Sequence, residues 1–129
     1  MKIVVYYALV GTPKKEGGSW EALAPDLPVT CSVASSYQEI LDRIKEAMEF
    51  ALENYVEEGE EFPDPQPKGS FEDVKERLQQ YGQSWEYVPI SVDLDAVEEK
   101  VKCEAAITLQ KLVRGHCARL GLGLVPGNN

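Results

Sequence analysis

The stretch at residues 37–57, YQEILDRIKEAMEFALENYVE, decides how the rest of the chain can fold. Its apolar residues recur at three- and four-residue steps while most of its acidic residues fall elsewhere around the wheel, which predicts an amphipathic helix. Ser36 stands at the N-cap with Glu39 three residues later, as in a capping box, and Gly59 supplies the stop. The apolar positions are Tyr37, Ile40, Leu41, Ile44, Ala47, Met48, Ala51, Leu52 and Tyr55.

The sheet that such a helix would cover is expected from the residues before it. Residues 3–10 are β-branched and aromatic, and a polar, glycine-rich loop separates them from a second expected strand at 19–24. The turn Pro25-Asp26-Leu27-Pro28 must leave the sheet because its two prolines remove two ladder donors. A third short strand is expected at 29–34, so the sequence predicts three antiparallel strands.

The residues after the long helix predict a connector, a second helix and a fourth strand. Residues 57–67 combine glutamates with alternate prolines, which favours an extended, solvated chain. A shorter helix is expected at 70–81, with Ser70 as its cap. A strand is expected at 85–94, where Pro89 restricts it to an edge or a bulged position.

The chain divides into a body at residues 1–95 and a tail at 96–129. In the tail we expect a polar helical turn, a short strand at 104–109 and a helix of about ten residues from Lys111, which ends near residues 121–123. The expected fold class is α+β: an antiparallel sheet of three to four strands packed by one long helix, with a short extra helix and a strand-helix tail.

Charge is distributed unevenly between these two parts. The chain carries 22 acidic and 13 basic residues, for a net charge of −9. Residues 1–99 hold 21 acids and 8 bases, net −13, whereas residues 100–129 hold five bases and one acid, net +4. The acidic body argues against a nucleic-acid binder and suits a basic partner.

The cysteines and the N-terminus indicate a reducing cytoplasm. The three cysteines form no CxxC pair, and neither a signal peptide nor an apolar run long enough to span a membrane is recognised. His116 and Cys117, with Cys103 upstream, are too few and wrongly spaced for a zinc site. We therefore expect no metal and no cofactor.

Catalytic chemistry finds little support in the sequence. The single histidine stands beside a glycine in the tail, and no nucleophile is paired with a base and an orienting acid. Asp93 and Asp95 share a face at the end of the fourth strand, where a metal-dependent nuclease would hold magnesium. That alternative needs further acids to converge on them, so no catalytic residue is assigned.

The order of these features resembles the HicB antitoxin family. The Pro25-Asp26-Leu27-Pro28 turn, a capped helix about ten residues later and the Glu57-Glu58-Gly59-Glu60-Glu61-Phe62-Pro63-Asp64-Pro65 segment match the family in order and spacing. The resemblance covers residues 2–65 and resumes at 85–94. The helical segment at 68–84 is longer than in many members of the family.

This resemblance implies a fold and a partner. The fold would be a partial RNase H-like one that lacks the catalytic acids of true RNase H. The partner would be a HicA-type toxin, a small basic ribonuclease that cuts messenger RNA with a histidine, and the antitoxin would cover that histidine and the RNA-binding face. An acidic body suits such a partner because it speeds encounter and mimics the charge of RNA.

Longer members of the family end in a DNA-binding module, and the tail resembles part of one. The run Ala106-Ile107-Thr108-Leu109 is similar to the ribbon of a ribbon-helix-helix, but Gly115 interrupts the following helix and the second helix is missing. We expect a truncated module that pairs ribbons into a homodimer. The alternative function is a DNA-binding transcriptional autorepressor. Candidate DNA or dimer contacts are Lys102, Ala106, Thr108, Lys111 and Arg114.

Overall fold

The computed structural model describes residues 2–120, with the side chains of residues 2–110 and of Leu112. One antiparallel sheet has the strand order β3-β2-β1-β4. The α+β class is confirmed, and β4 occupies the edge position that Pro89 predicts. The strands are β1 (Ile3–Gly11), β2 (Trp20–Ala24), β3 (Val29–Ala34) and β4 (Trp85–Asp93), and the helices are α1 (Tyr37–Glu58), α2 (Glu72–Gln79) and α3 (Leu94–Leu120).

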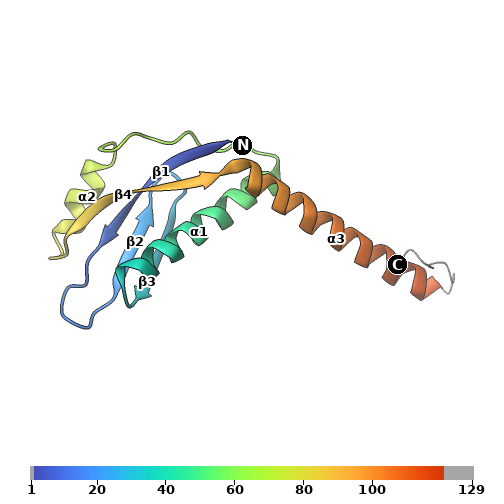
Figure 1. The fold of residues 1–129 in the computed structure, drawn as a ribbon, viewed down its shortest axis with the longest axis horizontal. Coiled ribbons are helices and arrows are strands. Elements are labelled where there is room, and N and C mark those ends of the chain that lie inside the picture. Colours follow the sequence, from blue (N-terminus) through green and yellow to red (C-terminus); the bar gives the residue numbers. More distant parts are fainter. Residues whose placement is uncertain (1, 121–129) are drawn as a thin grey trace.

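The main core lies between α1 and one face of the sheet (Figure 1). The centre of the predicted α1 stripe is fully buried there, against inward-facing residues of the sheet, whereas Tyr37 at its start is 45% exposed. Burying each such side chain contributes about 1.5–3 kcal/mol, so this layer supplies most of the hydrophobic stabilisation. Its central residues are Tyr6, Ala8, Ile40, Ile44, Met48, Leu52 and Val92.

The other face of the sheet carries a smaller core under α2. Leu9 and Trp85 are buried on this face, and the ammonium of Lys75 from α2 lies 5.4 Å from the centroid of the Tyr87 ring. The Trp85 ring packs so closely on Gly11 that an added Cβ would lie 2.7 Å from it. The inserted helix therefore packs on the sheet of its own chain.

The second helix is shorter than the sequence predicts, and its predicted cap is wrong. α2 spans Glu72–Gln79 instead of residues 70–81, and Phe71 occupies the N-cap position without a side-chain hydrogen bond. Ser70 instead forms part of the preceding turn, where its N–H donates to Pro67 O. The helix packs on β4, and this contact, not a side-chain cap, holds it in position.

The connector returns the chain along the length of the sheet. Gly59 ends α1 in the left-handed conformation, with φ of 71°. Residues 60–67 then run back without helix or strand to a turn at 68–71 that leads into α2, so β4 enters from the far end and pairs antiparallel with β1 (Figure 1). The alternate prolines favour this extended path because they fix φ and cannot continue a helix.

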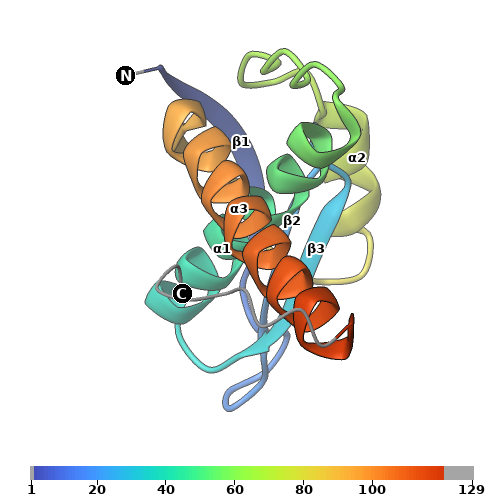
Figure 2. The ribbon, with the colours of Figure 1, turned by 90° about the vertical axis from the view of Figure 1, so that its right-hand side faces the viewer.

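The predicted strand at 104–109 is wrong, and so is the division of the tail into strand and helix. Leu94 to Leu120 form one continuous helix, α3, which begins directly after β4 and extends away from the body (Figures 1 and 2). The alternation of apolar residues over 104–109 fits a strand. However, apolar residues also recur at steps of three and four from Leu94 onward, and this longer pattern favours the helix. The predicted helix end at 121–123 lies outside the described residues.

Among the described residues, no helix combines the length and the apolar character needed to cross a membrane.

Candidate functional site

The Pro25-Asp26-Leu27-Pro28 turn joins the second and third strands and also holds the distant connector. Leu27 N–H donates to Ala24 O at 3.1 Å, which places Pro25 at the turn position that its fixed φ suits. Leu27 itself is buried in the core. The Asp26 carboxylate accepts a hydrogen bond from the backbone N–H of Gln66 at 3.1 Å, so the turn binds the chain forty residues later.

A second bond fixes the same connector to the sheet. Tyr6 Oη donates to Pro63 O at 2.7 Å from the first strand. Burial, with Asp26 and Asp64 nearby, raises the pKa of Tyr6 to about 12, so the hydroxyl keeps its proton for this bond. The two segments that carry the family resemblance thus meet in space, and their contacts hold the return path in place.

The start of α1 is capped by side chains on both sides of its first turn. Ser36 is the N-cap, and its Oγ accepts a hydrogen bond from Glu39 N–H at 3.1 Å. The Glu39 carboxylate accepts from both the N–H and the hydroxyl of Ser35, and it pairs with Arg43 at 2.7 Å. These hydrogen bonds from Ser35 lower the pKa of Glu39, with Arg43 adding to the effect. The cap sets where α1 begins.

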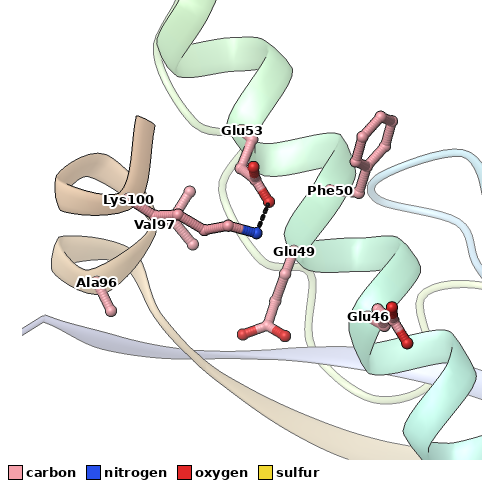
Figure 3. A pocket seen from close by; sticks show the side chains of 7 residues that line it. All are labelled: Glu46, Glu49, Phe50, Glu53, Ala96, Val97 and Lys100. Atoms are coloured by element: carbon pink, nitrogen blue, oxygen red, sulfur yellow. Dashed lines mark hydrogen bonds and ion pairs between the residues drawn. The ribbon is translucent and has the colours of Figure 1, made fainter. Parts of the chain in front are cut away.

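The junction of α1 and α3 contains a partly buried ion pair. Lys100 Nζ lies 3.2 Å from Glu53 Oε2, and Figure 3 shows the amine reaching across from α3 to α1. The neighbouring Glu53 carboxylate raises the pKa of Lys100. Val97 packs beside this pair in the main core. The pair bridges α1 and α3 beside the buried residues Leu94, Val97 and Val101, which pack the start of α3 on the body.

An acidic face covers the C-terminal half of α1 and the start of the connector. Residues 46–64 hold eight acidic residues and no basic one. Glu46, Glu49, Phe50 and Glu53 line a cleft against the first turns of α3 (Figure 3). Phe50 is 65% exposed although it stands among these carboxylates. We call the exposed residues of this surface, together with the half-buried Glu49, the acidic face: Glu46, Glu49, Phe50, Glu57, Glu58, Glu60, Glu61 and Asp64.

Of the two aspartates considered for metal binding, Asp93 caps the start of α3. Asp93 Oδ1 accepts from the backbone N–H groups of Asp95 and Ala96, at 3.1 and 3.2 Å, as a helix cap does. Within residues 2–110, no group of three His, Cys, Asp or Glu side chains is placed to hold a metal ion. The side chains of His116 and Cys117 lie outside the described part of the chain.

The residues predicted to contact DNA or a second copy all lie in α3, but they do not gather on one face. Lys102, Ala106 and Thr108 are exposed, and their spacing distributes them around the helix axis. Lys111 and Arg114 belong to the same helix, with side chains outside the described part. No strand is present at 104–109, so the predicted ribbon is wrong, whereas contact of these positions with DNA or with a second copy stays a prediction.

Sequence reasoning overlooked Phe50 as a surface residue. Phe50 falls outside the apolar stripe of the helix, at a position where the neighbours Glu46, Glu49 and Glu53 are acidic. An aromatic side chain on the polar side of an amphipathic helix is the signal that could have identified it.

Comparison with known proteins gives one family and one similar structure. A family model described as HicB_like antitoxin of bacterial toxin-antitoxin system matches residues 6–117. The crystal structure of the Burkholderia pseudomallei antitoxin HicB is similar at 17% sequence identity and a TM-score of 0.46, covering 92% of this chain and 99% of that one. No curated protein matches the chain.

Proposed function

The chain belongs to the HicB-like antitoxin family of bacterial toxin-antitoxin systems, and we propose that it neutralises a small basic ribonuclease of the HicA type. It would bind the RNA-binding face of the toxin and cover the catalytic histidine. The antitoxin contributes no catalytic group in this proposal, because inhibition needs only occupation of that face.

The acidic face is the observation that carries this proposal. Its carboxylates come from a helix packed on the sheet and from a connector held by Tyr6 and Asp26, so the backbone that carries them is in place before binding. A fixed surface of one charge attracts an RNA-binding protein and competes with the phosphates that this protein would otherwise bind. Preorganisation also reduces the entropy lost on association.

Phe50 adds an apolar contact to the charged surface of the acidic face. Aromatic side chains at the centre of an interface often carry a large share of the binding free energy, because they bury much apolar area with few rotatable bonds. Phe50 is exposed and surrounded by carboxylates, which matches an apolar anchor with a polar rim. We place the centre of the toxin interface here.

Affinity measurements with charge-reversed variants test this assignment. The partner is the small basic protein encoded in the neighbouring reading frame, titrated with the full antitoxin chain. Glu46→Lys combined with Glu49→Lys should raise Kd at least about tenfold, mainly through slower association. The matched control is Glu76→Lys with Glu86→Lys, two exposed acids outside the acidic face, which should change Kd much less. Equal effects of both pairs would reject the acidic face as the interface.

The aromatic anchor is tested in the same titration. Phe50→Ala should raise Kd by about tenfold or more through faster dissociation, as loss of a central aromatic anchor does. Tyr81→Ala is the control because Tyr81 is 71% exposed outside the acidic face. If Phe50→Ala left the affinity for the toxin unchanged, the interface would not be centred on Phe50.

DNA-binding autorepression is the second candidate function. The feature that favours it is the basic charge of α3, in which residues 105–120 hold three bases and no acid. Such a helix can approach phosphates, although the ribbon that reads bases is absent from the described residues. Salt-dependent, sequence-specific binding to a palindromic operator is the expected observation, and no binding at low salt would remove this candidate.

A further inference from the structure

The cleft between α1 and the first turns of α3 combines charged and apolar walls. It has a volume of about 370 Å³. Carboxylates of α1 line one side together with the exposed Phe50 ring, and Ala96, Val97 and Lys100 of α3 line the other (Figure 3). A cleft of this composition suits a long side chain that has an apolar stem and a positively charged end.

Glu53 is the most buried carboxylate of the cleft. Only 10% of its side chain is exposed, and among the described residues its ion pair is with Lys100, at 3.2 Å. Burying a carboxylate is costly unless a cation stays close to it. The Lys100 side chain is 59% exposed, so its ammonium can return to water at little cost once another cation reaches Glu53. The Glu53 carboxylate therefore needs a cation, and its present cation can be exchanged.

Glu49 stands one helical turn before Glu53 and has acceptors that Lys100 does not use. It lines the same cleft but makes no hydrogen bond or ion pair with any described side chain. Its charge still acts on Lys100, whose pKa is raised mainly by the hydrogen bond and charge of Glu53 and less by Glu104 and Glu49. The Lys100 ammonium pairs with one carboxylate, whereas a planar guanidinium carries several N–H donors and can bind two carboxylates at once.

The apolar walls of the cleft favour arginine over lysine as its occupant. Phe50 is 65% exposed and lies on the side of the cleft away from α3 (Figure 3). A guanidinium is weakly hydrated and stacks on aromatic rings, whereas an ammonium is compact and strongly hydrated. Ala96 and Val97 on α3 offer contact to the methylene groups of the stem. An arginine that enters past Phe50 thus finds partners for its ring-like end and for its stem.

We propose that this cleft binds one arginine side chain of the basic partner, whose guanidinium replaces Lys100 on Glu53 and also binds Glu49. Lys100 is then an internal competitor, which satisfies Glu53 in the free chain and returns to solvent in the complex. The identity of the partner rests on the proposed function, whereas the arginine site itself does not depend on it. The site also makes binding selective, because a basic surface without an arginine at this position leaves Glu49 and Phe50 without their contacts.

The two members of the ion pair should have opposite effects on the affinity for the HicA-type ribonuclease. Glu53→Gln should raise Kd at least about tenfold, because it removes the central carboxylate. Lys100→Gln should lower Kd at least about threefold, because it removes the competitor. Lys102→Gln is the matched control: it makes the same change of charge at an exposed position of α3 outside the cleft, and it should lower Kd less. A weaker complex in both Glu53→Gln and Lys100→Gln would mean that the pair only holds α3 in place, and it would overturn the proposal.

A small probe tests the site without the ribonuclease. N-acetylarginine amide is titrated into the wild-type full chain, and binding is followed by NMR chemical shifts. Saturable shifts are expected at Phe50 and Ala96, and they should be lost in Glu53→Gln. They should also be absent with N-acetylcitrulline amide, which has a similar shape but no charge. Shifts spread evenly over the carboxylates of residues 57–61, or no shift at Phe50, would overturn the site.

The two titrations separate the arginine site from the proposed function. If the probe binds in the cleft but the ribonuclease does not bind the chain, the arginine site stands and the proposed function fails. If the ribonuclease binds but Glu53→Gln leaves its Kd unchanged, the proposed function stands and the arginine site fails.

Discussion

The two long helices of this protein begin from similar sequence patterns and reach different environments. α1 has apolar residues at three- and four-residue steps, and the sheet completely buries those at the centre of the stripe, Ile40, Ile44, Met48 and Leu52. α3 has the same steps from Leu94 to Leu112, but burial stops at Val101, where α1 ends. Periodicity therefore predicts which residues share a face, whereas the neighbouring element decides whether that face contributes to the stability of a single chain.

The largest expected effect separates the two helices directly. Ile44 in α1 is fully buried, whereas Ile107 in α3 is 52% exposed. Ile44→Ala should lower the free energy of unfolding by about 2–5 kcal/mol, because it removes apolar contacts and leaves a cavity. Ile107→Ala should change it by less than about 0.5 kcal/mol. Urea unfolding of both variants measures the difference, and equal losses would contradict the comparison.

A close approach in the smaller core gives the next effect. Gly11→Ala would force a Cβ into the Trp85 ring, so we expect a loss of about 1–3 kcal/mol in the free energy of unfolding. Combining it with Trp85→Phe should cost less than the sum of the two single changes, because the smaller ring relieves the clash. Additive losses would show that Gly11 is not constrained by this contact.

The hydrogen bond that holds the connector to the first strand can be removed without changing a residue of any helix. Tyr6→Phe removes the part-buried hydrogen bond to Pro63 O and should cost about 1 kcal/mol of the free energy of unfolding. The exposed Tyr81→Phe is the control.

The same bond predicts an alkaline dependence. The pKa of Tyr6 is raised from 10.0 to about 12, so its contribution to stability is complete below pH 10 and lost as pH rises towards 12. Unfolding measured over this range should show a steeper fall for the wild type than for Tyr6→Phe. Parallel curves would contradict the assigned bond.

The smallest effect concerns the cap of α1. Ser36→Ala should destabilise the chain by about 1 kcal/mol through the lost bond to Glu39 N–H. The lowered pKa of Glu39 means that its contribution is present above its ordinary pKa of 4.5 and is lost as pH falls through the lower folded value. Ser35→Ala should flatten this acidic dependence, because Ser35 is the main cause of the shift, and an unchanged acid profile would refute that cause.

Much of the fold follows from local patterns. The long helix with its Ser36 cap, the three N-terminal strands and the edge position of β4 were all predictable, because each rests on periodicity, capping or proline chemistry within a short window. The α3 helix was not predictable from such a window, because the apolar residues Ala105, Ile107 and Leu109 alternate with other residues as they would in a strand. Only the Asp93 cap together with the helical spacing of apolar residues from Leu94 onward indicates that this segment is a helix.

The candidate site was predictable only in part. The charge excess of the body is visible in composition, but its concentration into one face depends on α1 turning Glu46, Glu53 and Glu57 to one side and on the connector following it. The bonds of Tyr6 to Pro63 and of Asp26 to Gln66 join residues far apart in sequence, which no local pattern encodes.

The central claim, that the acidic body masks a basic ribonuclease, is tested most directly by RNA cleavage. A small basic ribonuclease of the HicA type, sought in the neighbouring reading frame, is mixed with increasing amounts of the full antitoxin chain, and the rate of messenger RNA cleavage is measured. We expect cleavage to fall to background near stoichiometric antitoxin and to recover at high salt, which screens the charges that hold the complex. An unchanged cleavage rate with excess antitoxin at low salt would contradict the account.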